Sequence, residues 1–295
     1  MKNSELAICF SANKTYLPHF TVACYSFLKN NPGEWNLVLM SDDVKESDLL
    51  KIRNCLYTVS PKSILELIVI DKNSLTDLIK GPVSRHGVQT YYRLLLADSL
   101  PTHINMALYF DSDLIVYQPI DIDFNSLKNN PISGVIDFKG EETARKRGIK
   151  NYYNAGVILL NLKIWRDENL LGSIFNFSPK HTDFVDQDLL NEFFGERWGT
   201  LSSLMNCHTG KVNRNTKGFF LNQEKKPIVL HFIGPGKPWK YWSTCSPLYW
   251  NYLIKTPYWY QTYKIPTTIL KKVIYKLYKA LKKGDLKGLK KNMRL

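Results

Sequence analysis

Short apolar runs alternate with amphipathic stretches through most of this chain, and this alternation gives the first indication of its fold. Apolar runs bounded by turn residues predict buried strands, which we place at residues 6–10, 37–40, 65–70, 107–110, 132–136, 157–162 and 228–232. Apolar positions at helical spacing predict helices at residues 18–30, 45–56 and 90–100. Strands that alternate with helices are typical of β-α-β units, so we expect an α/β domain that begins with a parallel sheet.

Polar residues follow several of the predicted strands. Segments 11–13 and 111–113 come directly after apolar runs, and Asp71 and Asp137 stand at corresponding places. Parallel strands end at one edge of their sheet, and open α/β folds bind their ligands at that edge. The sequence therefore predicts a binding site there.

Asp111 and Asp113 are the most informative pair among these residues. Only Ser112 separates them, and they stand where the apolar run 107–110 ends. Hard divalent cations prefer oxygen ligands and keep positions open for water or phosphate oxygens, so two carboxylates here suit a diphosphate substrate. Two aspartates also occur in ordinary turns, where they accept hydrogen bonds from the backbone. The pair by itself leaves both interpretations open.

The composition indicates a globular protein. Its 295 residues are 44% hydrophobic and 13% aromatic, which is enough to bury the core of one large domain. No apolar run is long enough to cross a bilayer, and the first residues lack a signal-peptide core, so we expect a cytoplasmic location. The five cysteines are scattered without a Cys-x-x-Cys pair, which favours reduced thiols over disulfides or a zinc site.

The net charge of +14 is concentrated at the C-terminal end. Residues 265–295 hold ten Lys or Arg and one acid, Asp285, and so carry +9 of that charge. Apolar residues recur there at steps of three and four from Leu270 to Leu281, with lysines between them, which predicts a basic amphipathic helix. We expect residues 266–295 to bind an anionic membrane surface, and a helix packed on its own domain is the alternative. Vesicle binding that survived truncation after Ile265 would contradict this expectation.

Six segments resemble one known pattern in their order and approximate spacing. They are Phe10-Ser-Ala-Asn13, Thr90-Tyr-Tyr-Arg93-Leu, Tyr109-Phe-Asp111-Ser-Asp113, Asn154-Ala-Gly156-Val-Ile-Leu-Leu-Asn161-Leu, Asp186-Gln187-Asp188-Leu-Leu-Asn191 and His231-Phe-Ile-Gly234-Pro-Gly-Lys237-Pro-Trp239. Over roughly residues 6–242 the chain thereby resembles glycosyltransferase family 8, especially the bacterial galactosyl- and glucosyltransferases that extend the lipopolysaccharide or lipooligosaccharide core. This resemblance implies a single Rossmann-like domain of the GT-A type with a mixed central sheet.

The resemblance also implies how the chain is divided. Residues 1–242 would form the UDP-sugar-binding catalytic domain, and residues 266–295 a peripheral membrane-association tail. Residues 243–265 between them are rich in aromatic residues and proline. Aromatic faces stack on sugar rings, so this segment is a candidate for the acceptor side, although packing at the domain edge would explain it equally well.

Members of this family use a divalent cation, usually manganese, to transfer a hexose from a UDP-sugar with retention of anomeric configuration. The matching metal ligands here are Asp111, Asp113 and His231. An imidazole ligand suits manganese better than magnesium, which is the alternative ion. Gly234 and Lys237 follow the histidine, where glycine lets the backbone approach the UDP phosphates and lysine would neutralise the departing β-phosphate.

The same resemblance implies the remaining contacts of the UDP-sugar. It places the uridine on Ser11, Ala12, Asn13 and Tyr16, and the rest of the donor on Arg93, Asp111, Ser112, Asp137, Asn154, Ala155, Gly156, Asp186 and Gln187. Asn13 departs from the aspartate that the bacterial relatives commonly carry, so it keeps a hydrogen-bond acceptor and loses a charge. Arg93 could instead be a structural ion-pair partner on a helical face.

Asp186 and Gln187 are the implied catalytic residues. The family match places Asp186 on the sugar hydroxyls and Gln187 near the β face of the anomeric carbon. Glutamine is a poor nucleophile, but its carbonyl oxygen can stabilise an oxocarbenium-like centre, which favours front-face substitution over double displacement. Thr182 precedes these residues as a candidate helix cap, and acids in a first helical turn also have a purely structural explanation.

Other functions compete with this interpretation. Asp-x-Asp after a strand also opens phosphohydrolase sites in which the first acid, here Asp111, is the nucleophile, but Leu114 and Ile115 replace the Gly-Thr usual there. A non-catalytic basic module is a second alternative, and the apolar stripe of its tail favours membrane over nucleic acid. A transferase could also act on another glycan or on a protein instead of a lipid-linked saccharide. The residues distinguish neither galactose from glucose as the donor sugar nor one oligomeric state from another.

Overall fold

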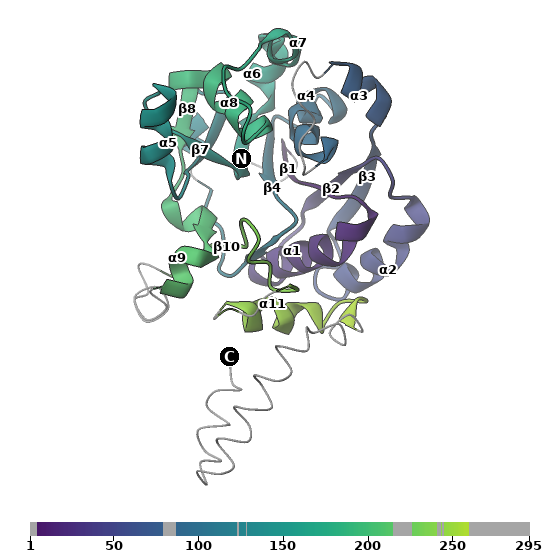
Figure 1. Ribbon diagram of the computed structural model, residues 1–295. Coiled ribbons are helices and arrows are strands. Elements are labelled where there is room, and N and C mark those ends of the chain that lie inside the picture. Colours follow the sequence, from purple (N-terminus) through teal and green to yellow (C-terminus); the bar gives the residue numbers. More distant parts are fainter. Residues whose placement is uncertain are drawn as a thin grey trace.

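A mixed sheet of seven strands forms the centre of the computed structural model, which describes residues 5–78, 87–122, 124–127, 129–214, 226–240, 243 and 245–259 (Figure 1). In spatial order the strands are β3 (Ile64–Val69), β2 (Asn36–Ser41), β1 (Leu6–Ser11), β4 (Met106–Phe110), β7 (Tyr153–Asn161), β6 (Ile132–Ile136) and β8 (Trp198–Thr200). Strands β1 to β4 are parallel, whereas β7 runs antiparallel to both β4 and β6. The carboxyl ends of β1, β4 and β6 therefore meet the amino end of β7 at one edge.

A second sheet of three strands continues from this edge. Its spatial order is β5 (Leu114–Val116), β10 (Val229–His231) and β9 (Cys207–His208). Strand β5 follows β4 after a three-residue turn, and β10 pairs with it in antiparallel orientation, with His231 opposite Leu114. This pairing carries the end of β10 to the turn between β4 and β5.

Helices cover both faces of the large sheet, as Figure 1 shows. The α-helices are α1 (Leu17–Asn30), α2 (Glu46–Tyr57), α3 (Lys72–Leu78), α4 (Leu96–Ser99), α5 (Gly140–Arg147), α6 (Leu162–Asp167), α7 (Leu170–Asn176), α8 (Asp186–Phe194), α9 (Thr209–Arg214) and α11 (Ser246–Leu253). Side chains of a strand alternate between its two faces, so Ile8 and Phe10 enter one core while Ala7 and Cys9 enter the other. The first core holds residues of α1, α2 and α11, and the second holds residues of α4, α6 and α8.

Most of the predicted elements are present, and one differs in type. Each of the seven predicted apolar runs overlaps a strand, and residues 18–30 and 45–56 match α1 and α2. The segment predicted as helical at 90–100 is helical, but it consists of a 3-10 helix, η3 (Val88–Leu95), followed by the short α4. In this tighter helix the carbonyl of Thr90 accepts a hydrogen bond from Arg93 Nε at 2.9 Å. The strands β5, β8 and β9 are too short to carry a periodic signal.

Two predicted regions fall partly or wholly beyond the described residues. The basic segment 266–295 lies outside them, so its membrane role stays a prediction. Of the aromatic segment 243–265, the structure describes 243 and 245–259, which contain α11. Within the described ranges, no helix has both the length and the apolar character needed to span a membrane.

Candidate active site

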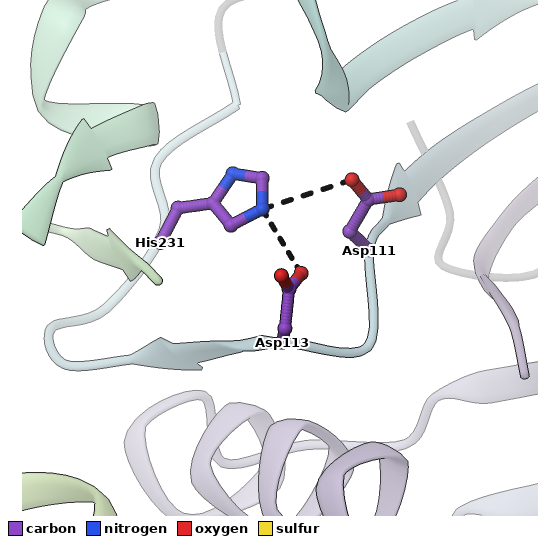
Figure 2. A group of neighbouring side chains, drawn as sticks. All are labelled: Asp111, Asp113 and His231. Carbon is purple, nitrogen blue, oxygen red and sulfur yellow. Dashed lines mark hydrogen bonds and ion pairs between the residues drawn. The ribbon is translucent and has the colours of Figure 1, made fainter. Parts of the chain in front are cut away.

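Two carboxylates and an imidazole converge at the edge where β4 ends. Asp111 and Asp113 lie in the turn between β4 and β5, and His231 is the last residue of β10. His231 Nε2 faces both carboxylates (Figure 2). It lies 3.0 Å from Asp113 Oδ1 and 3.7 Å from Asp111 Oδ2. One ligand atom from each residue lies within 4.8 Å of the others. The structure thus brings together the three residues that the sequence predicted as metal ligands.

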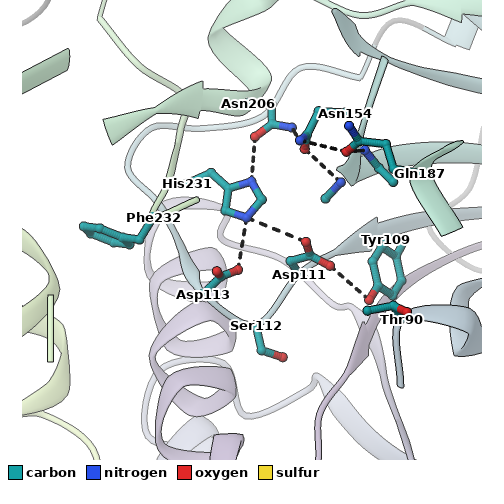
Figure 3. A network of polar contacts seen from close by, with 12 residues as sticks. Thr90, Tyr109, Asp111, Ser112, Asp113, Asn154, Gln187, Asn206, His231 and Phe232 are labelled. Atoms are coloured by element: carbon teal, nitrogen blue, oxygen red, sulfur yellow. Dashed lines mark hydrogen bonds and ion pairs between the residues drawn. The ribbon is translucent and has the colours of Figure 1, made fainter. Parts of the chain in front are cut away.

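A chain of hydrogen bonds fixes the orientation of His231 (Figure 3). Asn154 Nδ2 donates to Asp137 Oδ2 at 2.9 Å, which leaves Asn154 Oδ1 to accept from Asn206 Nδ2 at 2.8 Å. Asn206 Oδ1 then accepts from His231 Nδ1 at 2.9 Å. Because Nδ1 is the donor, the lone pair of a neutral His231 is on Nε2, the atom that faces both carboxylates.

This arrangement fits a divalent cation. If Nε2 of His231 is uncharged, it and the facing oxygens of Asp111 and Asp113 are three hydrogen-bond acceptors with no donor among them. A cation bound at their centre would satisfy all three atoms. Oxygen ligands with one imidazole match the preferences of manganese better than those of magnesium. The hydrogen bond from Nδ1 to Asn206 is the outer-shell contact that such ligating histidines usually make.

Lys237 adds a positive charge at the same point. Its ammonium donates to Asp113 Oδ2, and also to the carbonyl of Phe232 at 2.7 Å. Burial alone would raise the pKa of Asp113, but the ammonium of Lys237 holds that pKa well below its usual range. The loop that carries Lys237 turns at Gly234, whose φ of +75° is in the region that favours glycine. The predicted phosphate-binding residue Lys237 therefore lies beside the predicted metal ligand Asp113, and Gly234 lies in the same loop.

Arg93 connects Asp111 to Asp186. Its Nη2 donates to Asp111 Oδ1 at 2.9 Å, and its Nε lies 3.2 Å from Asp186 Oδ2. The guanidinium also lies over the ring of Tyr109 at 4.4 Å and donates to the carbonyl of Ala155. Burial raises the pKa of Asp186 to about 6, although Arg93 opposes this change. The ion pairs predicted as the structural role of Arg93 are thus present, and they lie inside the site.

Gln187 and the start of β7 form the other wall. Gln187 Oε1 accepts hydrogen bonds from Asn154 Nδ2 and from the backbone N–H of Ala155, both at 3.1 Å. Both lone pairs of this oxygen are therefore engaged in the described structure. Gly156 follows, and a Cβ there would lie 2.2 Å from His231 Cε1 and 2.7 Å from Asp111 Oδ2. Only glycine leaves room for these two side chains.

The residues predicted for uridine lie along the end of β1. Ser112 Oγ donates to the carbonyl of Ser11 at 2.8 Å, which links this strand end to the acidic turn. Asn13 Oδ1 accepts from the backbone N–H of Tyr16 at 3.1 Å and so caps the short 3-10 helix η2 (Lys14–Tyr16). Ala12 is buried between them, whereas Tyr16 is 37% exposed. The side-chain oxygen of Asn13 therefore accepts a hydrogen bond within its own turn.

Tyr16 belongs to an aromatic group that supports the Lys237 loop. Its ring meets His19 and Trp239 edge to face, and His19 stacks on Trp239 with ring centroids 3.4 Å apart. His19 Nδ1 and the hydroxyl of Tyr249 are 2.5 Å apart, which ties this group to α11. Burial lowers the pKa of His19 to about 3, so it is neutral at physiological pH. The loop is thereby packed against α1 and α11.

The sequence did not identify Asn206, which orients His231. Asn206 lies in the 3-10 helix η6 (Ser203–Asn206), and no pattern around it indicates a functional residue. Thr182 is not the cap of α8, because Val185 is the N-cap residue and makes no side-chain capping hydrogen bond. The prediction that Asp186 and Asp188 lie in a first helical turn is confirmed.

A cavity of about 840 Å³ opens next to this network. Asp137, Phe138, Asn154, Asn206 and His208 are among its lining residues. In the aromatic segment predicted for the acceptor side, Tyr249, Tyr252 and Tyr258 are buried in the first core, whereas Trp259 is 51% exposed. An acceptor role for residues 243–265 stays a prediction.

Several known glycosyltransferases are similar to this chain in sequence. Lipopolysaccharide 1,2-glucosyltransferase of Escherichia coli is 24% identical over 257 residues, which cover 80% of this chain and 74% of that protein. Lipopolysaccharide 1,3-galactosyltransferase of Salmonella typhimurium is 27% identical over 172 residues, which cover 52% of this chain and 50% of that protein. Glycosyltransferase GlyE of Streptococcus pneumoniae is 24% identical over 263 residues, and the match spans 62% of its length.

Two solved structures confirm the α/β fold with a mixed sheet of the GT-A type. Galactosyltransferase LgtC, in complex with donor and acceptor sugar analogs, has a TM-score of 0.66 and 21% identity, over 85% of this chain and 96% of that one. The bifunctional glycosyltransferase WbbM has a TM-score of 0.71 and 21% identity, over 90% of this chain and 52% of that one. The model of Glycosyl transferase family 8 matches residues 7–243. This chain is therefore a glycosyltransferase that belongs to family 8.

Proposed function

We propose that this protein is a retaining hexosyltransferase that moves galactose or glucose from a UDP-sugar to a core saccharide of lipopolysaccharide or lipooligosaccharide, with Mn²⁺ as cofactor. The observation that carries the proposal is the convergence of Asp111, Asp113 and His231 beside Lys237, with Asp186 and Gln187 on the opposite wall. Relatives named as lipopolysaccharide galactosyl- and glucosyltransferases support the donor and acceptor classes.

The acids and the histidine would hold the cation against the diphosphate of the donor. A bound Mn²⁺ would act as a Lewis acid that polarises the diphosphate oxygens. Lys237 would supply its ammonium to the departing β-phosphate, where negative charge grows as the bond to the sugar breaks. Interactions that strengthen as this charge develops accelerate the reaction, because they bind the transition state better than the donor.

Asp186 and Gln187 would hold the sugar on the other side. Asp186 is almost fully buried, so its carboxylate would accept strong hydrogen bonds from sugar hydroxyls once water is displaced. Gln187 is neutral and its carbonyl oxygen already accepts two hydrogen bonds, which argues against covalent attack by this residue. Front-face substitution, in which the acceptor hydroxyl attacks from the leaving-group side, is the mechanism that these contacts favour.

The competing assignments find less support. Asp111 Oδ1 is held by Arg93 and by the hydroxyl of Tyr109, which does not suit the free nucleophile of a phosphohydrolase.

The basic segment predicted at residues 266–295 favours a lipid-linked acceptor at an anionic membrane surface, reached from the cytoplasmic side. Another glycan or a protein is the alternative acceptor.

A donor screen tests this proposal. Purified protein is incubated with Mn²⁺ and with UDP-galactose, UDP-glucose or their N-acetyl analogues, and release of UDP is measured. We expect slow hydrolysis of one hexose donor that depends on the metal, because water can replace the acceptor hydroxyl. Addition of core saccharide should then increase UDP release and give an α-linked product, which NMR of the anomeric proton would identify.

Three outcomes would contradict parts of the proposal. Phosphate release from a monoester, with every UDP-sugar left intact, would favour the phosphohydrolase. A β-linked product would exclude retention. Turnover of an N-acetylhexosamine donor alone would exclude galactose and glucose. Chelation with EDTA followed by readdition of Mn²⁺ or Mg²⁺ is the control that identifies the effective cation.

A further inference from the structure

Asp188 is a buried carboxylate whose two oxygens are both engaged. It has 0% exposure and lies in the first turn of α8, next to Gln187. Its Oδ1 accepts from the Tyr152 hydroxyl at 2.6 Å, and its Oδ2 accepts from the backbone N–H of Phe184 at 2.8 Å. A carboxylate without solvent costs several kcal/mol unless it is paired and hydrogen-bonded, so this placement needs a compensating partner.

Arg147 is that partner. Its Nη2 lies 3.1 Å from Asp188 Oδ1 and 3.2 Å from Asp183 Oδ2, and its side chain is 6% exposed. It is the last residue of α5, and its guanidinium lies 5.7 Å from the ring of Tyr152. A buried ion pair contributes little net stability compared with apolar residues of similar volume, but it holds its groups in one geometry.

Tyr152 is the second partner of Asp188, and Phe184 links Asp188 to the site. Burial and the hydrogen bond to Asp188 raise the pKa of Tyr152. Asp188 also accepts from the backbone N–H of Phe184, whose carbonyl accepts from the backbone N–H of Gln187 at 2.9 Å. Gln187 in turn accepts from the backbone N–H of Ala155 through Oε1. The contacts thus run from Arg147 and Tyr152 to Asp188, and from Asp188 through Phe184 to Gln187 on the predicted donor-sugar wall.

The backbone before α8 also requires support. Val185 is β-branched, yet its φ is +47° with ψ −106°, and no side chain caps the helix there. Such a conformation costs on the order of 1–3 kcal/mol and persists only where the surroundings fix it. The hydrogen bond from the Phe184 N–H to Asp188 holds the residue directly before it. This strained residue, Val185, comes directly before α8. Asp186 and Gln187 are the first two residues of that helix, so their positions depend on the turn.

We propose that Arg147, Asp188 and Tyr152 are positioning residues that hold Gln187, and with it the Ala155 backbone, in the geometry required for sugar transfer. This inference rests on the proposed function for its kinetic part and on the contacts alone for its structural part. None of the three is a catalytic residue, because each acts through Gln187. We call Arg147, Asp188 and Tyr152 the positioning triad.

Two substitutions test the triad. Tyr152→Phe removes only the hydroxyl that donates to Asp188, and Arg147→Met removes the charge while keeping much of the side-chain volume. We expect kcat, counted per UDP-binding site, to fall roughly 10- to 100-fold in each, with the UDP dissociation constant changed by less than about 3-fold. The double variant should lose little more than the worse single one, because both changes break one path.

Matched controls separate positioning from stability. Tyr153→Phe removes the hydroxyl of the neighbouring tyrosine, which contacts Thr200 and lies outside the triad. Arg166→Met removes an arginine that binds the carbonyls of Ala97 and Ile104. Neither control substitution should change kcat per UDP-binding site, whatever its effect on the melting temperature. Equal kcat per site in the triad variants and these controls would overturn the kinetic part.

Amide hydrogen exchange tests the same proposal without turnover. The Ala155 N–H is protected by Gln187 Oε1, so it should exchange faster in Tyr152→Phe and Arg147→Met, while amides deeper in β7 keep their rates. Unchanged exchange at Ala155 would overturn the positioning triad. If wild-type protein turned over no UDP-sugar but Ala155 responded in this way, the proposed function would fail and the triad would stand.

Discussion

Gly156→Ala is expected to lower sugar transfer by roughly 100-fold or more, because it displaces two proposed metal ligands at once. The added Cβ would lie 2.2 Å from His231 Cε1, 2.7 Å from Asp111 Oδ2 and 2.9 Å from His231 Nδ1. Neither side chain can move freely, since Asn206 holds His231 and Arg93 holds Asp111. The methyl group must therefore separate the imidazole from the carboxylate.

Binding and kinetics together identify this effect. Mn²⁺ affinity, measured by electron paramagnetic resonance or calorimetry, should fall together with transfer, and high Mn²⁺ should restore only part of the activity. Gly172→Ala is the matched control, because it makes the same change within α7, away from the site. That variant should transfer sugar at the wild-type rate. Wild-type Mn²⁺ affinity in Gly156→Ala protein would show that the proposed ligand geometry is wrong.

Asp113→Asn is expected to lower transfer by roughly 100- to 1000-fold, equivalent to several kcal/mol of transition-state stabilisation from the metal. The amide keeps the shape of the carboxylate and removes its charge. Lys237 donates to this group, so the substitution also leaves its ammonium without that acidic partner. Weaker Mn²⁺ binding should accompany the loss of turnover, while the far-UV spectrum remains that of the folded protein.

A surface acid provides the control for Asp113. Asp167 is exposed and pairs only with Lys163 one helical turn away among the ion pairs described, a type of contact that contributes about 0–1 kcal/mol. Asp167→Asn should therefore leave both Mn²⁺ binding and transfer unchanged. An Asp113→Asn enzyme with full Mn²⁺-dependent activity would refute the metal site, and one that bound Mn²⁺ normally but failed in transfer would assign Asp113 to the chemistry instead.

Local patterns in the sequence were enough to predict six of the seven strands of the central sheet and the place of the site. The apolar runs that become β1, β4 and β6 end in polar residues, and parallel strands necessarily bring such ends to one edge. The resemblance to family 8 added His231, Lys237 and Gln187 to that edge. The structure places all three there, and the family itself is confirmed.

Short or irregular elements escaped prediction for a physical reason. Strands such as β5 and β9 contain too few residues for a period of two to appear, although β5 aligns β10 and hence His231. The helix at Val88–Leu95 has the composition of an α-helix but is of the 3-10 type, and local propensity does not separate the two.

By itself the sequence determined which segments are buried and that Asp111 and Asp113 end a core strand, because hydrophobic periodicity and strand termini are local properties. Only the tertiary structure decided what surrounds those acids. The pairing of β10 with β5 places His231 beside Asp113 across 118 positions of sequence, and the relay through Asn206 sets which imidazole nitrogen faces the acids. The contact of Arg147 with Asp188 likewise joins α5 to α8. Such contacts depend on how distant elements pack, which no local pattern in the chain records.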